Sequence, residues 1–268
     1  MITSSSLGNN GHLGNQMFQY ASLRGIAHNR GFDWAIPPAE SFGSRYNVRS
    51  SIYDCFTLGS VSNNNITTDF PTDQFSERQF NFDSDLFENC QDNIDMHGYF
   101  QTERYFKDIA ESIKEDFSFK SDIEQAANEI FNGMPPDTFT SIHIRRSDYI
   151  GNDAYHTNIQ TDYYYDIIDN IADIDNIIIF SDDIDWCRAN INFSEKSNIL
   201  FSSNAPYVDL CAMSMCRINI IANSSFSWWA AWLNSNKDKK VFAPTNWFGP
   251  ANSHLNTEDL IPNNWIIK

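Results

Sequence analysis

The sequence predicts an α/β protein whose C-terminal half contains a parallel β-sheet. From residue 138 onward, segments with a strand pattern alternate with segments that have a helix pattern. Two of the strand segments, Ile177–Phe180 and Ile218–Ala222, are mostly apolar, as are strands that a sheet buries on both faces. With 268 residues, 41% of them hydrophobic, the chain is long enough for two domains with their own cores. We therefore expect two domains, the second of them Rossmann-like.

The N-terminal half begins with a glycine-spaced loop, Gly8–Gly14, that leads into a helix. Apolar residues at helical spacing within Met17–Leu23 would pack inward. The glycine spacing differs from that of dinucleotide-binding folds, and the residues before it are too polar to predict a buried strand. The loop either lets the backbone approach a ligand and presents Asn15 and Gln16, or is a simple turn with a polar helix start.

The rest of the N-terminal half is less regular. Residues 32–88 suggest only short strands and loops, because Asn, Ser, Asp and Phe follow no clear period there. Residues 94–117 indicate a strand, a glycine turn and a helix, and a further helix is expected at Ser121–Phe131. A glycine and two prolines then end the pattern. We therefore place the first domain at residues 1–134 and the second at residues 135–268.

The second half has the pattern of a sheet whose strands are joined by helices. The expected elements are strand Thr138–Ile144, helix Thr161–Asp173, strand Asn176–Phe180, helix Asp183–Asn190, strand Ile199–Ser202, helix Ala205–Met215, strand Arg217–Ala222, helix Phe226–Asn234 and strand Lys240–Ala243. The apolar tail Asp259–Ile267 is expected to pack back on the body. In open parallel sheets the ligand crevice lies outside the carboxyl ends of the strands, so the residues that follow each strand are candidates for a site.

The strand Thr138–Ile144 ends in two arginines and an aspartate. Side chains alternate along a strand, so His143 and Arg145 share one face and Arg146 takes the other. A guanidinium at this place matches pairs of carboxylate or phosphate oxygens, and Arg145 therefore indicates an anion site. The alternative is that Arg145 or Arg146 pairs with Asp148 to hold a turn.

Two further strand ends carry polar residues. Asp182 and Asp183 could hold a metal ion, but Asp183 stands where a helix cap belongs, and we favour the cap. Asn223, Ser224 and Ser225 lead from a strand into a helix, whose free N–H groups and dipole attract anions. For these three residues, ordinary helix capping is the alternative.

Three tryptophans at helical spacing, Trp228, Trp229 and Trp232, follow this turn. We expect them in the core rather than as a platform for a sugar.

A strand-end arginine and a helix-start serine cluster in one sheet could together clamp a diphosphate without a metal ion. Such a clamp suits a nucleotide-sugar transferase, because fixed donors stabilise the charge that the leaving diphosphate gains.

The composition excludes several classes of partner. A net charge of −17 argues against nucleic acids and anionic membranes, which are bound with an excess of Lys and Arg. No apolar run approaches the roughly 20 residues that span a bilayer, and the start lacks the pattern of a signal peptide. The five scattered cysteines have no metal or redox spacing and fit reduced, buried thiols. We therefore expect a cytoplasmic protein without a transmembrane segment.

Five blocks of sequence keep a characteristic order from near the N-terminus to the tail. They are Leu13–Ala21, Gly98–Gln101, His143–Tyr149, Ile221–Trp229, and Ala243–Pro244 with Trp247–Phe248. Together these blocks resemble the α-1,2-fucosyltransferases of glycosyltransferase family 11. The resemblance implies a GT-B-like fold of two Rossmann-like domains, with the donor bound by the C-terminal one. It also implies GDP-fucose as donor, inversion at the anomeric carbon, no metal or other cofactor, and usually the 2-hydroxyl of a galactose-terminated oligosaccharide as acceptor.

The resemblance carries roles to particular positions. The implied donor-binding residues are Asn15, Gln16, His143, Arg145, Asp209, Asn223, Ser224, Ser225 and Phe226. Of these, His143 and Arg145 would contact the nucleotide and its diphosphate, the serines would lie on the phosphates, and Asp209 would meet the guanine edge. Asn15 and Gln16 would face the cleft from the other domain.

The chain departs from the family pattern at three places. Ser147 and His12 stand where the family usually has glycine, and Thr3–Ser6 stands where it has an apolar first strand. These departures concern the turn after Arg146 and the arrangement of the first strand.

The mechanism implied is a single displacement by an acceptor hydroxyl. Arg145 and the Ser224 turn would stabilise the departing GDP while a carboxylate takes the proton. Asp148 and Asp153 are the candidate bases, with His156 behind them, although Asp148 could instead orient an arginine and a dissociative route needs no base. Two rival functions are a protein O-fucosyltransferase and a non-catalytic carbohydrate-binding protein that uses the tryptophans.

Overall fold

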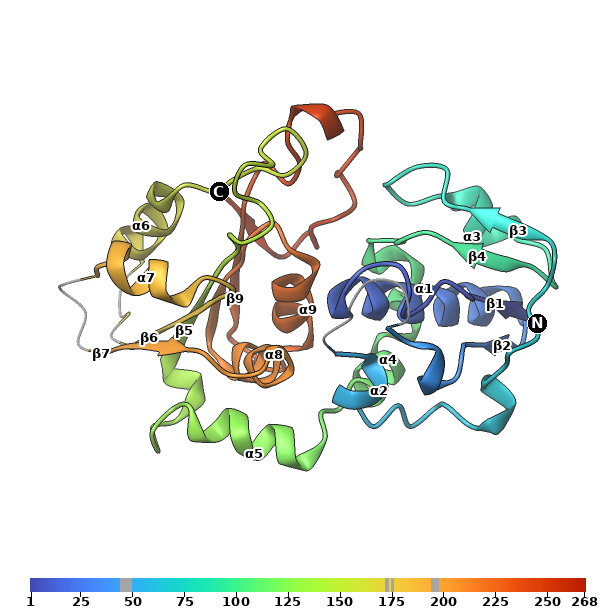
Figure 1. The fold of residues 1–268 in the computed structure, drawn as a ribbon, viewed down its shortest axis with the longest axis horizontal. Helices are drawn as coiled ribbons and strands as arrows, with labels where there is room; N and C mark the ends of the chain where they lie inside the picture. Colours follow the sequence, from blue (N-terminus) through green and yellow to red (C-terminus); the bar gives the residue numbers. More distant parts are fainter. Residues whose placement is uncertain (44–49, 172–173, 175, 194–197) are drawn as a thin grey trace. The chain divides into compact units, whose positions relative to one another are not determined.

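The computed structural model in Figure 1 describes residues 1–43, 50–171, 174, 176–193 and 198–268. The chain forms two compact units, each with its own parallel sheet. Unit 1 comprises Met1–Lys120 and Leu255–Pro262, and unit 2 comprises Ser121–His254 and Asn263–Lys268. The chain therefore passes from one unit to the other three times, after residues 120, 254 and 262.

The sheet of unit 1 has the strand order β2-β1-β4-β3, and every neighbouring pair is parallel. Its elements are β1 (Ile2–Thr3), α1 (Leu13–Arg30), β2 (Trp34–Ala35), α2 (Ile52–Cys55), β3 (Gln74–Ser76), α3 (Ser84–Asn89), β4 (Asp95–His97) and α4 (Ala110–Asp116), with short 3₁₀ turns at Ala39–Ser41, Asn63–Asn65, Glu103–Tyr105 and Lys107–Ile109. The helix expected after the glycine loop is α1, which is buried along most of its length and ends at Gly31 in the left-handed conformation.

The first strand is buried although its sequence is polar, which the sequence alone did not predict. β1 lies in the middle of the sheet, and both of its residues are fully buried. The carboxylate of Asp95 on β4 accepts hydrogen bonds from the Thr3 hydroxyl at 2.6 Å and from the Ser5 amide at 2.8 Å. Because a partner from a distant segment satisfies the polar groups, this strand can be buried without an apolar sequence.

The irregular stretch 32–88 holds short strands, as expected, but also two helices that the sequence pattern does not predict, α2 and α3. The longer of the two is α3. Asp83 begins it, and its carboxylate accepts a hydrogen bond from the amide of Leu86 at 3.0 Å. Residues 44–49 of this stretch lie outside the described residues. The helix expected up to Phe117 is α4, preceded by 3₁₀ turns.

The sheet of unit 2 has the order β10-β9-β8-β5-β6-β7 and is parallel throughout. Its elements are α5 (Ser121–Glu129), β5 (Phe139–Ile144), α6 (Thr161–Asn170), β6 (Asn176–Ser181), α7 (Ile184–Asn190), β7 (Asn198–Ser202), α8 (Pro206–Met215), β8 (Ile218–Ile220), α9 (Ser225–Leu233), β9 (Lys240–Ala243) and β10 (Ile266–Ile267), with 3₁₀ turns at Pro136–Thr138 and Pro250–Asn252. The alternation predicted for this half is confirmed. Residues 172 and 173, the expected end of the helix at α6, lie outside the described residues.

The division between the units falls before α5, whereas the sequence pattern placed it after this helix. The reason is that α5 packs on α8 of unit 2. The segment Leu255–Pro262 belongs to unit 1, where Asp259 accepts a hydrogen bond from Arg104 at 2.8 Å. The final residues return to unit 2 as β10, which pairs with β9.

The two faces of the unit 2 sheet differ in chemistry. On one face, Ile142 and Ile144 of β5 join an apolar core with α6 and α7, while α8 and α9 lie on the other side (Figure 1). On that second face β5 presents Ser141, whose hydroxyl accepts a hydrogen bond from Asn219, and His143, which contacts α9. The sheet therefore directs its polar residues toward the face that carries α9.

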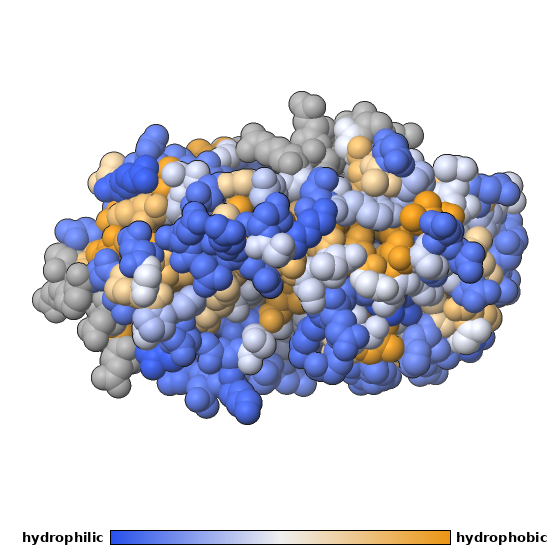
Figure 2. Space-filling model, turned by 90° about the horizontal axis from the view of Figure 1, so that it is seen from below, coloured by the Kyte–Doolittle hydropathy of each residue, from blue (hydrophilic) through white to orange (hydrophobic). Residues whose placement is uncertain are grey.

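The surface seen in Figure 2 is mainly hydrophilic, with apolar residues in separate small areas. Within the described part of the chain, no helix combines the length and the apolar character that crossing a membrane requires.

Candidate functional site

The site begins at the carboxyl end of β5, with His143. The ring is buried, at 4% exposure, and its Nδ1 lies 2.9 Å from the hydroxyl of Ser227 on α9. Burial, together with the nearby charge of Arg145, lowers the pKa of His143 to about 3. The imidazole is therefore neutral at physiological pH and takes part through hydrogen bonds rather than charge.

Arg145 follows the strand and holds two carboxylates. Its guanidinium lies 2.7 Å from Asp148 and 3.1 Å from Asp182, and it stands over the ring of Tyr149 at 5.6 Å. Burial works against the charge, but the two carboxylates outweigh it, and the pKa of Arg145 is raised. The pairing with Asp148 that the sequence left open is present.

The turn after Arg145 is fixed by Asp182, at the end of β6. Its carboxylate accepts hydrogen bonds from the amides of Arg146 at 2.9 Å and Ser147 at 3.2 Å. Arg146 points to α7 instead, where it pairs with Asp183 at 3.2 Å. Asp183 also accepts a hydrogen bond from the amide of Trp186 at 3.3 Å, which confirms that it caps α7. The sequence indicates Asp182 only as a possible metal ligand and does not predict its role in this turn.

The loop between β8 and α9 is held by Asn223. This side chain is buried, and its amide donates to the carbonyls of Thr157 at 2.9 Å and Trp247 at 2.8 Å. Ser224 caps α9 by accepting a hydrogen bond from the amide of Phe226 at 3.4 Å, as the capping alternative predicted. The Phe226 ring lies 5.6 Å from that of His143, and Ser225 is half-buried as the first residue of α9.

One side chain joins Arg145 to this loop. Tyr149 places its ring under the guanidinium and donates its hydroxyl to the carbonyl of Asn223 at 2.9 Å. The ends of β5 and β8 are thereby tied together through Arg145, Tyr149 and Asn223. Tyr149 and Ser227 lie inside the sequence blocks, but the sequence does not predict them as site residues, because their partners are distant in sequence.

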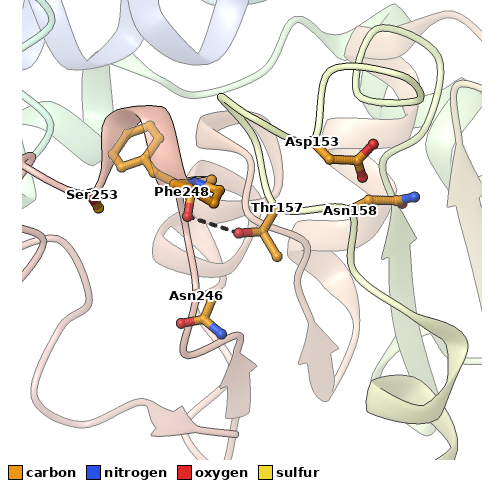
Figure 3. Close-up of a pocket in the computed structure, with 8 residues that line it drawn as sticks. Asp153, Thr157, Asn158, Asn246, Phe248 and Ser253 are labelled. Atoms are coloured by element: carbon orange, nitrogen blue, oxygen red, sulfur yellow. Dashed lines mark hydrogen bonds between the residues drawn. The ribbon is translucent and has the colours of Figure 1, made fainter.

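The three candidate bases occupy different surroundings. Asp148 is engaged by Arg145, and the ring of His156 stacks on Tyr149 at a centroid distance of 4.4 Å. The pKa of His156 is lowered, mainly by burial. The charge of Asp148 opposes this shift, and the charge of Arg145 adds to it. Asp153 lines a pocket of about 530 Å³ (Figure 3). Of the three, only Asp153 lines this pocket, and it forms no hydrogen bond or ion pair with the described residues.

The pocket lies between two loops of unit 2. Asp153, Thr157 and Asn158 come from the loop before α6, and Asn246, Phe248 and Ser253 from the segment after β9. The Thr157 hydroxyl donates to the carbonyl of Phe248 at 3.0 Å, the dashed line in Figure 3. Gly249 brings the loops together, since a Cβ added there would lie 2.2 Å from the carbonyl oxygen of Asp153.

Asp209 lies in the first turn of α8, beside the carboxyl end of β7. It is buried, and its carboxylate accepts a hydrogen bond from the hydroxyl of Ser202 on β7. Burial raises the pKa of Asp209 to about 7, although the bond from Ser202 works in the opposite direction. A buried acceptor at a strand end can receive paired N–H donors of a ligand.

Asn15 and Gln16 lie at the start of α1 in unit 1. The side-chain oxygen of Asn15 accepts a hydrogen bond from Gln101 at 2.9 Å. Gln16 is fully buried, donates to the carbonyl of Ser50 at 3.3 Å and accepts from the amide of Ile52 at 3.1 Å. These contacts give Gln16 a structural role in unit 1.

Among the residues that the structure describes, no group of three or more His, Cys, Asp or Glu side chains is arranged to hold a metal ion. All five cysteines are buried free thiols, as expected. Trp228, Trp229 and Trp232 are buried, at 7% exposure or less, which confirms their assignment to the core.

Comparison with known proteins identifies relatives over most of the chain. The family model described as Glycosyl transferase family 11 matches residues 3–268. An α-1,2-colitosyltransferase of Escherichia coli is 33% identical over 206 residues, which cover 74% of this chain and 68% of the relative. A galactoside 2-α-L-fucosyltransferase, SEC1 of Bos taurus, is 24% identical over 83% of this chain, which spans 62% of the relative's length.

Solved structures with a similar fold include POFUT1 in complex with GDP-fucose, with a TM-score of 0.57 and 12% identity over 89% of this chain and 95% of that one. The fucosyltransferase NodZ from Bradyrhizobium gives a TM-score of 0.56 with 13% identity, over 85% of this chain and 91% of that one. At these identities the likeness shows the fold, which is the GT-B-like class that the sequence predicted.

Proposed function

Because the chain belongs to glycosyl transferase family 11, we propose that it transfers L-fucose from GDP-β-L-fucose to the 2-hydroxyl of a galactoside, with inversion at the anomeric carbon. The names of its relatives support α-1,2 transfer. The Escherichia coli enzyme is named as an α-1,2-colitosyltransferase, and the bovine enzyme is named as a galactoside 2-α-L-fucosyltransferase. The observation that carries the proposal is the link from Arg145 through Tyr149 to Asn223, which places a cation beside a helix start at adjoining strand ends.

The donor diphosphate would bind where Arg145 and the start of α9 meet. Arg145 offers a planar set of donors, and Ser224 and Ser225 stand at the positive end of α9. As the glycosidic bond breaks, charge develops on the leaving phosphate, and these fixed groups stabilise it. Phe226 and the neutral His143 complete the wall, and no step in this scheme requires a divalent ion. For Asn15 and Gln16, the donor-binding role stays a prediction.

The guanine would bind at Asp209. The N1–H and the 2-amino group of guanine are neighbouring donors, and one carboxylate can accept both. Asp209 is buried next to Ser202, so the carboxylate is held in place before the base arrives. Burial raises the pKa of Asp209 in the free protein, whereas the two donors of a bound guanine would favour its ionised form.

Asp153 is the base that the surroundings favour. Asp148 already neutralises part of Arg145, and its removal would change the donor clamp rather than the proton transfer. His156 is stacked on Tyr149, which holds the Arg145 turn. Asp153 remains available to accept the proton of an acceptor hydroxyl in the pocket that it lines.

Colitose is a second candidate for the sugar that is transferred. The Escherichia coli relative named for colitosyl transfer is 33% identical over 74% of this chain. Colitose lacks one hydroxyl of fucose, so a site that hydrogen-bonds this hydroxyl would discriminate strongly against it.

The test is to incubate the protein with GDP-fucose and lactose, to measure GDP release, and to determine the product linkage by NMR. An α-1,2-linked fucosyl lactose is expected. Release of GDP only with serine- or threonine-containing polypeptide acceptors would indicate protein O-fucosylation. Binding of glycans without turnover would indicate a carbohydrate-binding protein, although the buried tryptophans cannot be its platform. The same assay with a colitose donor decides between the two sugars, and cell fractionation tests the predicted cytoplasmic location.

A further inference from the structure

The pocket between the loop before α6 and the segment after β9 has chemistry that differs from the rest of the site. The residues that line it include no lysine and no arginine, and Asp153 is their single carboxylate. Such a lining does not suit a phosphate. Asn158, Asn246 and Ser253 offer amide and hydroxyl groups, which match the hydroxyls of a neutral sugar.

The polar groups of this pocket are available for a ligand. Within the part of the chain that the structure describes, the side chains of Asp153, Asn158 and Asn246 make no hydrogen bond or ion pair. The half-buried Phe248 contributes the aromatic part of the lining. Small-molecule sites typically combine such an apolar wall with a few placed polar groups in about 300–1,000 Å³, and about 530 Å³ lies in this range.

The walls of the pocket are held rigidly although both are loops. Backbone hydrogen bonds join Gly249 to Tyr155 at 3.0 Å and Ala251 to Ala154 at 2.7 Å. The side-chain amide of Asn223 donates hydrogen bonds to the backbone carbonyl of Thr157 on one wall and to that of Trp247 beside the other wall. The unpaired side chains therefore project from a fixed backbone, which reduces the entropy lost on binding.

The same asparagine connects the pocket to the proposed diphosphate clamp. The side chain of Asn223 holds the two walls, while its carbonyl accepts the hydrogen bond from Tyr149, over which Arg145 lies. A sugar in the pocket would thus lie beside the clamp, with Asp153 able to accept a proton from one of its hydroxyls.

We propose that this pocket is the subsite for the terminal neutral sugar of the acceptor, bound by Asn158 and Asn246 against Phe248. This inference rests on the proposed transferase function and adds the place and the chemistry of acceptor recognition. The fucosyl group of the donor is also neutral, so a test must separate the two sugars.

The test uses the variants Asn158→Ala, Asn246→Ala and their combination in the full chain, with lactose as acceptor. Each lost hydrogen bond is expected to raise the KM for lactose about 3- to 10-fold, and the double variant about 10- to 100-fold. The KM for GDP-fucose and the Kd for GDP should stay within about twofold. The matched control is Asn190→Ala at the exposed end of α7, where the amide bonds only to its own helix and all constants should be unchanged.

Three outcomes would overturn the inference. They are an unchanged lactose KM in the double variant, a rise in the donor KM alone, and a thermal unfolding midpoint lowered enough to account for the loss. Saturation-transfer NMR with lactose and GDP separates this inference from the proposed function. If the protein lacks transfer activity but its lactose signal is lost in the double variant, the subsite stands without the reaction. If it neither binds nor fucosylates lactose, both fail.

Discussion

Arg145 holds two carboxylates and an aromatic ring before any ligand arrives. Because these partners fix its guanidinium, a diphosphate would meet a donor that needs little reorganisation. We predict that Arg145→Ala lowers kcat about 100- to 1,000-fold, the usual effect of removing one preorganised donor from a developing anion. Arg188→Ala, which removes an exposed arginine from an ion pair on α7, is the control and should leave kcat unchanged. A near-normal rate for Arg145→Ala would remove this residue from the clamp.

Asp209 leads to a prediction about pH. Burial raises its pKa to about 7, so the free protein protonates it at mildly acidic pH, whereas guanine binding requires the carboxylate. The affinity for GDP should therefore fall about tenfold for each pH unit below 7, and level off above it. In Asp209→Asn, GDP binding measured by calorimetry should be weak and should keep only the pH dependence that comes from the terminal phosphate of GDP, whose second ionisation lies at about pH 6. A flat wild-type profile between pH 5 and 8 would contradict the assignment of Asp209 to guanine.

The same pKa affects stability in the opposite direction. Since Asp209 binds its proton more tightly in the folded than in the unfolded chain, its contribution is present below the unfolded pKa near 4 and is lost as pH rises toward 7. The wild-type protein should thus lose stability relative to Asp209→Asn across this window, as measured by urea unfolding at several pH values.

Single residues also show what the sequence could and could not predict about the site. The sequence predicts Arg145 and Asn223 as site residues because strand ends in a parallel sheet converge, and the structure places them in one network. It predicts neither Tyr149 nor the role of Asp182 in the turn, because a tyrosine or an aspartate in a loop gives no sign of its partner. The link between Tyr149 and Asn223 spans residues that only the order of strands in the sheet brings together.

At the scale of elements, the two loops around the pocket depend on close backbone contact. Gly249 has an ordinary φ of −76°, so a larger residue is excluded there by steric contact and not by backbone strain. In Gly249→Ala the added Cβ would lie 2.2 Å from the carbonyl oxygen of Asp153 and 2.7 Å from the carbonyl carbon of Ala154, and the loops must separate. We expect a loss of about 1–3 kcal/mol in the free energy of unfolding, measured by urea denaturation.

The matched control for this substitution is Gly59→Ala, because a Cβ at Gly59 has no atom within 4 Å. This variant should be as stable as the wild type. If Gly249→Ala is equally stable, the contact between the two loops does not constrain them.

Elements were predicted well where their sequence pattern is long, and poorly where distant partners decide. Every strand expected between residues 138 and 243 is present, because alternating buried strands and helices leave a repeated signal. β1 has two residues, too few for any period, and its burial depends on Asp95 far along the chain. The sequence pattern also does not predict that the division between the two units falls before α5, since this depends on which unit the helix packs against.

At the scale of the whole molecule, a net charge of −17 means that any bound phosphate must be held by local donors. The proposed clamp consists of Arg145 and the start of α9. We therefore predict that the rate of fucosyl transfer in excess EDTA stays within about twofold of the untreated rate, a change smaller than the loss of a single hydrogen bond would cause. The measurement is GDP release before and after chelation. A fall that Mg²⁺ or Mn²⁺ restores would show that these donors are insufficient.

The three passages of the chain between its units have a consequence for biosynthesis. Residues 1–120 leave the ribosome first, yet the piece that completes their unit, Leu255–Pro262 with Asp259 on Arg104, is translated after nearly all of the other. Domains generally fold as they emerge, in order from the N-terminus. The first unit therefore stays incomplete until residues 255–262 have been translated, and a nascent chain that stalls before them would expose a partly assembled first unit when the second is almost complete.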